Sequence, residues 1–164
     1  MFVYIGSKEN QLGVLQIDDE SGCQIRTLDV MQVVDDSLVP PSPEGFFSRW
    51  TAKLTTPTTE WILRHPEMDL IYVFVGFMSL GESLVTTYHV DRKTGLLGKM
   101  GVCSTGGLQV SYATFSPDRS LLVVCHHNDG QLSFFECNKN GGVLEAPIRV
   151  IKTPEVRPGT QCTD

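Results

Sequence analysis

The chain has 164 residues, enough for one domain with a buried core, and its 41% hydrophobic and 20% charged residues are typical of a globular protein. The net charge of -6 argues against nucleic acid or an anionic membrane surface as partner, and no apolar run approaches the roughly 20 residues that span a bilayer. The first ten residues lack the basic segment of a secretory signal, so we expect a cytoplasmic protein whose five cysteines are reduced.

Short apolar runs with a period close to two predict β-strands over residues 1–30. The predicted strands are Phe2–Ile5, Leu12–Ile17 and Gln24–Val30. Residues 31–57 then interrupt the pattern with four prolines and three aromatic residues. Most long insertions are not functional sites, so we interpret this one as a connection that covers an exposed face.

Two sets of four predicted strands follow the insertion, with polar turns between the strands. The first set is Glu60–Arg64, Leu70–Val75, Leu84–Val90 and Leu97–Val102. The second set is Val110–Phe115, Leu121–His126, Gln131–Glu136 and Val143–Ile151. The closing segment, 153–164, contains Pro and Gly and has no strand signal.

The two sets repeat one another at an offset of 51 residues. Residues 61–73 read WILRHPEMDLIYV, and residues 112–124 read YATFSPDRSLLVV. A repeat of this length made only of short strands is typical of a β-propeller blade. The predicted fold is therefore all-β: a partial β-propeller of about three blades of four antiparallel strands. Residues 1–30 form a partial blade, and 58–102 and 103–152 form full blades.

Three blades do not close a ring, because a closed propeller needs roughly four to eight. The terminal blades would keep open strand edges, which tend to pair with other chains. Three explanations stay open. The chain is a fragment of a longer protein, copies of it self-associate through the open blade edges, or its gene model is truncated.

Three turns of the chain are characteristic: the glycine pair at 106–107, Ser-Pro-Asp at 116–118 and Thr-Gly-Leu-Leu at 94–97. In this register they resemble the seven-bladed lactonase family, which includes propeller-type 6-phosphogluconolactonases and carboxymuconate cyclases. The resemblance covers most of the chain and corresponds to the N-terminal half of such a protein. It implies hydrolysis of a sugar lactone such as 6-phosphogluconolactone, in which donors polarise the carbonyl group and a base activates water. We expect no cofactor.

The densest polar cluster follows the strand Leu121–His126. An imidazole there can act as a general base or bind a carboxylate or phosphate, so His127 is the predicted catalytic residue and His126 a predicted substrate contact. The alternative for both is a hydrogen bond that stabilises the turn. Adjacent residues of a strand face opposite sides, so only one of the two imidazoles can point into the central channel of a propeller. A metal needs three or four converging ligands, and the spacing of polar residues around these histidines does not provide them.

Two further substrate contacts are predicted. Tyr112 stands where the lactonase family commonly has a histidine. Arg157 has the guanidinium group that binds phosphate or carboxylate, although a solvated charge is the simpler interpretation. Glu60 and Glu67 are interpreted as single carboxylates without a partner, and His65 as a structural turn residue.

The region that would supply the family's main catalytic histidine is absent from this chain. Two hypotheses therefore stay open. The chain is a lactonase-like propeller that needs a full ring for activity and is inactive as it stands, or it is a non-catalytic propeller fragment that acts as a protein-interaction scaffold.

Overall fold

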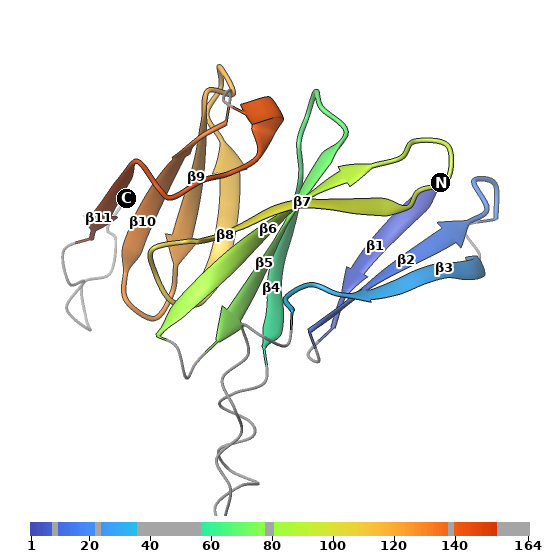
Figure 1. Cartoon of the computed structure of the whole chain (residues 1–164), viewed down its shortest axis with the longest axis horizontal. Helices are drawn as coiled ribbons and strands as arrows, with labels where there is room; N and C mark the ends of the chain where they lie inside the picture. Colours follow the sequence, from blue (N-terminus) through green and yellow to red (C-terminus); the bar gives the residue numbers. More distant parts are fainter. Residues whose placement is uncertain (8–9, 22–23, 36–56, 78–80, 138–139, 154–164) are drawn as a thin grey trace, which may run out of the picture.

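The structure of the chain, a computed structural model, describes residues 1–7, 10–21, 24–35, 57–77, 81–137 and 140–153. The regular structure of these residues is β, apart from one 3-10 turn at Asn140–Gly142. The strands form three antiparallel sheets that lie side by side (Figure 1). The prediction of an all-β partial propeller is confirmed. The described residues contain no helix with the length and apolar character needed to cross a membrane.

Each sheet is built from consecutive strands. The first contains β1 (Phe2–Gly6), β2 (Gln11–Ile17) and β3 (Gln24–Gln32) in that order. The second contains β4 (Thr58–Arg64), β5 (Leu70–Phe77), β6 (Glu82–Val90) and β7 (Leu97–Ser104). The third contains β8 (Val110–Phe115), β9 (Leu121–His126), β10 (Gln131–Glu136) and β11 (Arg149–Lys152).

The prediction of a strand over Val143–Ile151 is wrong for its first six residues, because β11 begins only at Arg149. Gly141 and Gly142 have φ angles of 65° and 86°, a left-handed conformation that turns the chain out of the sheet. The next residues cross toward the second sheet, where the Leu144 amide donates a hydrogen bond of 3.4 Å to Thr87 Oγ1. A tertiary contact therefore overrides the apolar pattern.

The first sheet has one strand fewer than the other two among the described residues. Most of the predicted insertion, residues 36–56, lies outside the described part of the chain. Its first residues, Met31 and Gln32, still belong to β3. Val33 and Val34, which follow, are fully buried. The Val33 carbonyl accepts hydrogen bonds from side chains of β6, so this stretch ties the first sheet to the second.

The core consists of two layers, one on each side of the second sheet. Alternate residues of β5 face opposite sides, so Ile71 and Val73 pack toward the first sheet and Tyr72 and Phe74 toward the third. Because both faces of β5 are covered, its sequence is a continuous apolar run. Each such fully buried side chain contributes roughly 1.5–3 kcal/mol to folding. Trp61 and Leu63 of β4 and Phe115 of β8 pack against the layer on the side of the third sheet. This packing holds β4 and β8, the first strands of their sheets, in place.

Candidate functional site

The site is built on β4 and β8, the first strands of the second and third sheets, which lie side by side (Figure 1). In each strand the pairing with its neighbour slips by one residue, at Glu60 in β4 and at Ser111 in β8. These two positions are 51 residues apart, the offset of the sequence repeat. A bulge of this kind redirects a side chain out of the regular alternation, and bulges are common beside active sites.

The Glu60 carboxylate joins three strands. Its Oε2 atom accepts hydrogen bonds from Ser83 Oγ of β6 at 2.8 Å and from the Val110 amide of β8 at 2.7 Å. Ser83 is fully buried, and its Oγ accepts a further hydrogen bond of 3.0 Å from the Gln109 amide. The interpretation of Glu60 as a carboxylate without a partner is wrong, because its partners lie on strands far away in sequence.

Burial raises the pKa of Glu60, and the hydrogen bonds from Val110 and Ser83 oppose this effect. The other carboxylate oxygen, Oε1, lies directly over Gly76 of β5, where any side chain would overlap it. Two hydrogen-bond donors therefore fix Oε2, and Oε1 fits only because Gly76 has no side chain.

A pocket of about 310 Å³ opens beside this carboxylate, and five residues line it: Gly6, Thr59, Glu60, Trp61 and Ile62. Two of its buried polar atoms, Thr59 Oγ1 and Trp61 Nε1, have no hydrogen-bond partner among the described residues. Both atoms are covered by surrounding residues, so they lie beneath the pocket surface and do not face a molecule bound in it. The pocket thus offers a fixed carboxylate beside the indole ring of Trp61, which suits a small molecule with hydroxyl groups.

Tyr112 of β8 contacts Trp61, one of the lining residues of this pocket. Its ring packs edge-on against Trp61, with 5.4 Å between the ring centroids, and half of its surface is exposed. Tyr112 and Trp61 occupy equivalent positions of the sequence repeat. Tyr112 therefore contacts a lining residue of the Glu60 pocket without lining the pocket itself, and its role as a substrate contact stays a prediction.

His126 is buried at the end of β9, where it pairs with Val110 in the neighbouring strand. Its Nε2 atom lies 3.0 Å from Ser133 Oγ, and its ring lies against the backbone of Gly107. Burial lowers the pKa of His126. A neutral, buried imidazole in this place holds the glycine turn onto the third sheet.

His127 lies on the outside of the same turn and is exposed. Its amide donates a hydrogen bond of 2.8 Å to the Gln109 carbonyl. The two histidines thus point to different sides, and neither lines the Glu60 pocket. Arg157 lies outside the described residues. Among those that are described, no group of three or more His, Cys, Asp or Glu side chains is placed to hold a metal.

Two other predictions for polar residues have clear outcomes. His65 is a structural turn residue, as predicted, because its Nδ1 atom accepts hydrogen bonds from the amides of Glu67 and Met68. Glu67 has a partner, contrary to the prediction, since its carboxylate pairs with Arg119 of the following blade. This pair is exposed, so it contributes little to stability.

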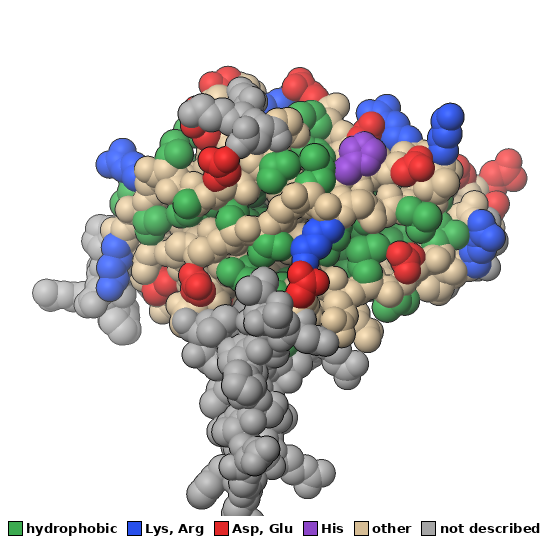
Figure 2. Space-filling view, viewed as in Figure 1, with side chains coloured by type: hydrophobic (Ala, Val, Ile, Leu, Met, Phe, Trp, Pro, Cys, Tyr) green, Lys and Arg blue, Asp and Glu red, His purple; other side chains and the backbone are tan. Residues whose placement is uncertain are grey.

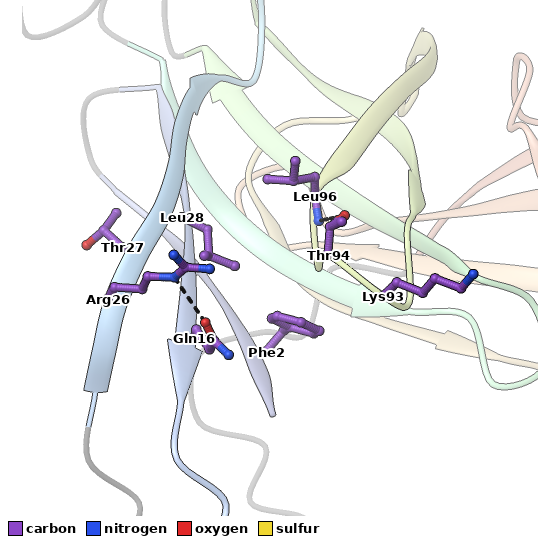
Figure 3. Close-up of a pocket in the computed structure, with 8 residues that line it drawn as sticks. All are labelled: Phe2, Gln16, Arg26, Thr27, Leu28, Lys93, Thr94 and Leu96. Carbon is purple, nitrogen blue, oxygen red and sulfur yellow. Dashed lines mark hydrogen bonds between the residues drawn. The ribbon is translucent and has the colours of Figure 1, made fainter.

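A second pocket, of about 440 Å³, lies between the first sheet and the β6–β7 turn (Figure 3). Its residues are Phe2, Gln16, Arg26, Thr27, Leu28, Lys93, Thr94 and Leu96. Arg26 donates a hydrogen bond to Gln16, and Lys93 extends away from Arg26 (Figure 3). The two cations do not converge, so this pocket lacks the charge arrangement of an anion site.

Residues 46–163 match the model of a protein family described as lactonase, 7-bladed beta-propeller. The chain belongs to this lactonase family. No curated protein matches the sequence.

Solved structures are similar in fold to this lactonase-family chain. The Pseudomonas aeruginosa periplasmic gluconolactonase PpgL is 17% identical, with a TM-score of 0.66 over 90% of this chain and 35% of that chain. A putative 6-phosphogluconolactonase from Bacteroides fragilis is 14% identical, with a TM-score of 0.66 over 96% of this chain and 38% of that one. A Lactobacillus plantarum protein is also 14% identical, with a TM-score of 0.69 over 93% and 38%. The chain therefore spans little more than a third of the length of these proteins.

Proposed function

We propose that this lactonase-family chain binds a sugar lactone in the Glu60 pocket and opens the lactone ring by hydrolysis. The observation that carries the proposal is the pocket itself, whose lining includes a carboxylate fixed by two hydrogen bonds and the indole ring of Trp61. A sugar lactone has hydroxyl groups that a carboxylate binds and a ring face that packs on an aromatic side chain. The membership of the lactonase family supports the same substrate class.

The residues in and around the pocket have distinct parts in this proposal. The ring of Trp61 forms an apolar wall for the sugar face, and Tyr112 packs against that ring from β8. His126 keeps the glycine turn in place behind β8. His127, the base predicted from the sequence, is an exposed imidazole on the neighbouring turn and keeps that role only as an alternative.

The test is hydrolysis of glucono-δ-lactone by the full chain, followed as acid release at constant pH and corrected for the spontaneous reaction. All five lining residues belong to this chain, so we expect saturable turnover without an added partner. Trp61→Ala should raise KM, because it removes the apolar wall of the pocket. The matched control is Tyr4→Phe, on another strand, which should leave KM unchanged. Wild-type rates equal to the spontaneous rate would refute the proposal.

A second candidate function, a scaffold for protein association, is favoured by the outer faces of the two terminal sheets. In β9, Leu122 and Val124 face the core, so Val123 and Cys125 face the opposite side, where they are half-buried. On the first sheet, Ile5 and Val30 are 50% and 56% exposed. Hydrophobic side chains also reach the surface in several patches in Figure 2. Exposed apolar faces of this kind favour association.

We propose that a second copy of the chain covers these faces. Light scattering of the wild-type chain should then give the mass of a dimer or larger assembly. Val123→Asp should yield monomers, whereas Thr94→Asp, at an exposed turn position of the second sheet away from these faces, should not. A monomeric wild-type chain over the whole accessible concentration range would rule out self-association.

A further inference from the structure

We propose that Glu60 is the proton acceptor of the lactone site, and that this site takes an uncharged sugar lactone rather than a phosphorylated one. The inference rests on the proposed function and adds to it a catalytic residue and a substrate class. It is argued from the position of the carboxylate, from the charges that line the pocket and from the chemistry of ring opening.

The position of the carboxylate is the first argument. Two donors on two other strands hold Oε2, at 2.8 Å and 2.7 Å, and Gly76 leaves the room that Oε1 occupies. The group therefore reaches the pocket wall in one fixed orientation, as a general base requires. An exposed imidazole such as His127 has no comparable restraint on its side chain in the structure.

The surroundings of the carboxylate are the second argument. The groups that face it are Ser83 of β6 and the Gln109–Val110 backbone before and in β8, all of them uncharged. Its raised pKa has burial as the main cause. A carboxylate with a raised pKa accepts a proton more readily than an ordinary one.

The charge of the pocket is the third argument. The five described residues of the lining include one acid and neither Lys nor Arg. A phosphorylated lactone would bring about two negative charges next to the Glu60 carboxylate, and no cation among these described residues would bind them. Phosphate sites in proteins normally contain Arg, Lys or a cluster of backbone amides. The lining therefore favours a lactone whose only polar groups are hydroxyl, ring and carbonyl oxygens.

The reaction step follows from this arrangement. The oxygen of a water molecule bonds to the carbonyl carbon of the lactone, and Glu60 takes one proton from that water. An oxyanion forms on the former carbonyl oxygen. When the bond between the carbonyl carbon and the ring oxygen breaks, the ring oxygen takes the proton back from Glu60. The product is the open-chain hydroxy acid, and the carboxylate is restored.

The experiment measures kcat and KM of the full chain with glucono-δ-lactone and with 6-phosphoglucono-δ-lactone. We expect kcat/KM for the unphosphorylated lactone to be higher by about tenfold or more, the effect of an uncompensated charge in the site. Glu60→Gln keeps an oxygen that can accept the Val110 hydrogen bond and removes the base. It should lower kcat by about 100-fold or more while KM stays within about threefold.

Two controls make the result specific. Ser111→Ala changes the equivalent bulge of β8, and His127→Ala removes the alternative base; both should keep kcat within about threefold of the wild type, because neither residue lines the pocket. The wild-type kcat should fall with acidification through one group whose pKa lies above the ordinary Glu value, and Glu60→Gln should lose this limb. If Glu60→Gln does not fold, this wild-type pH profile decides alone, and a flat profile overturns the proposal.

Three results would overturn the inference while leaving lactone hydrolysis intact. They are a folded Glu60→Gln variant with wild-type kcat, loss of activity in His127→Ala alone, and a preference for the phosphorylated lactone. Absence of wild-type turnover with both lactones is a different result. It refutes the proposed function itself and is seen before any variant is made.

Discussion

The hydroxyl group of Tyr72 joins the second sheet to the irregular segment before β11. It donates a hydrogen bond of 2.8 Å to the carbonyl of Gly142, 70 residues away, and both residues are buried. Tyr72→Phe keeps the ring and its packing but leaves the Gly142 carbonyl without its donor. The loss of a hydrogen bond that leaves a buried group unpaired costs about 1–3 kcal/mol. For a chain of this size, the melting temperature should fall by about 6 °C for a loss of 2 kcal/mol.

Tyr88→Phe is the matched control, because Tyr88 is buried to the same degree and also donates to a carbonyl. Its hydrogen bond to Val33 is longer, 3.3 Å, and the same carbonyl accepts a second bond from Thr86 Oγ1. The carbonyl therefore keeps a partner, and the cost should stay below about 1 kcal/mol. Guanidinium unfolding followed by circular dichroism gives both values. Equal losses in the two variants, or no loss in Tyr72→Phe, would refute the reasoning.

Three further predictions concern the site and its surroundings. Gly76→Ala should displace the Glu60 carboxylate, because the new methyl group would overlap Oε1, and should lower kcat by about tenfold or more; Gly98→Ala, which meets open space, should not. Trp61→Phe removes an indole nitrogen that has no hydrogen-bond partner among the described residues, so the free energy of unfolding should be unchanged within about 1 kcal/mol, while the smaller aromatic wall should raise KM for the lactone. Burial lowers the pKa of His126 in the folded chain. Below about pH 6.5, the ordinary pKa of a histidine, the unfolded chain therefore binds more protons than the folded chain. The free energy of unfolding should fall as the pH drops from about 6.5 toward the lowered pKa of His126. His126→Gln should reduce this loss of stability below about pH 6.5. His65 and Glu60 also have shifted pKa values, but they are present in the wild type and in the variant alike. An identical pH dependence of stability in the two proteins would contradict the assignment to His126.

The fold was accessible from the sequence because blade structure is local and repeated. The polar turn at 65–69 recurs at 116–120, and each of these turns is followed by an apolar strand. Each strand alternates or is continuously apolar according to its burial. The error at 143–148 has the opposite origin. Those residues are apolar enough for a strand, but the left-handed pair Gly141-Gly142 and the contact of Leu144 with the second sheet decide their path.

The site was less accessible than the fold. Alternation along a strand predicted that His126 and His127 face opposite sides, but it did not predict which of the two is buried. Glu60 was missed because its hydrogen-bond partners lie 23 and 50 residues further along the chain. A single carboxylate in a sequence shows neither a tertiary partner nor a bulge, since both depend on how neighbouring sheets meet.

The repeat nevertheless contains a signal for the site. The bulges of β4 and β8 occupy equivalent positions, but one holds Glu60 and the other Ser111. Ser111 is exposed and its hydroxyl only reaches the Cys125 carbonyl, at 3.4 Å, whereas Glu60 binds the first amide of the next blade. The fold thus provides the same backbone irregularity in successive blades, and one side chain decides whether it becomes a fixed carboxylate in a pocket. In a propeller, residues that differ between equivalent bulges of the inner strands are therefore the first positions to examine for chemistry.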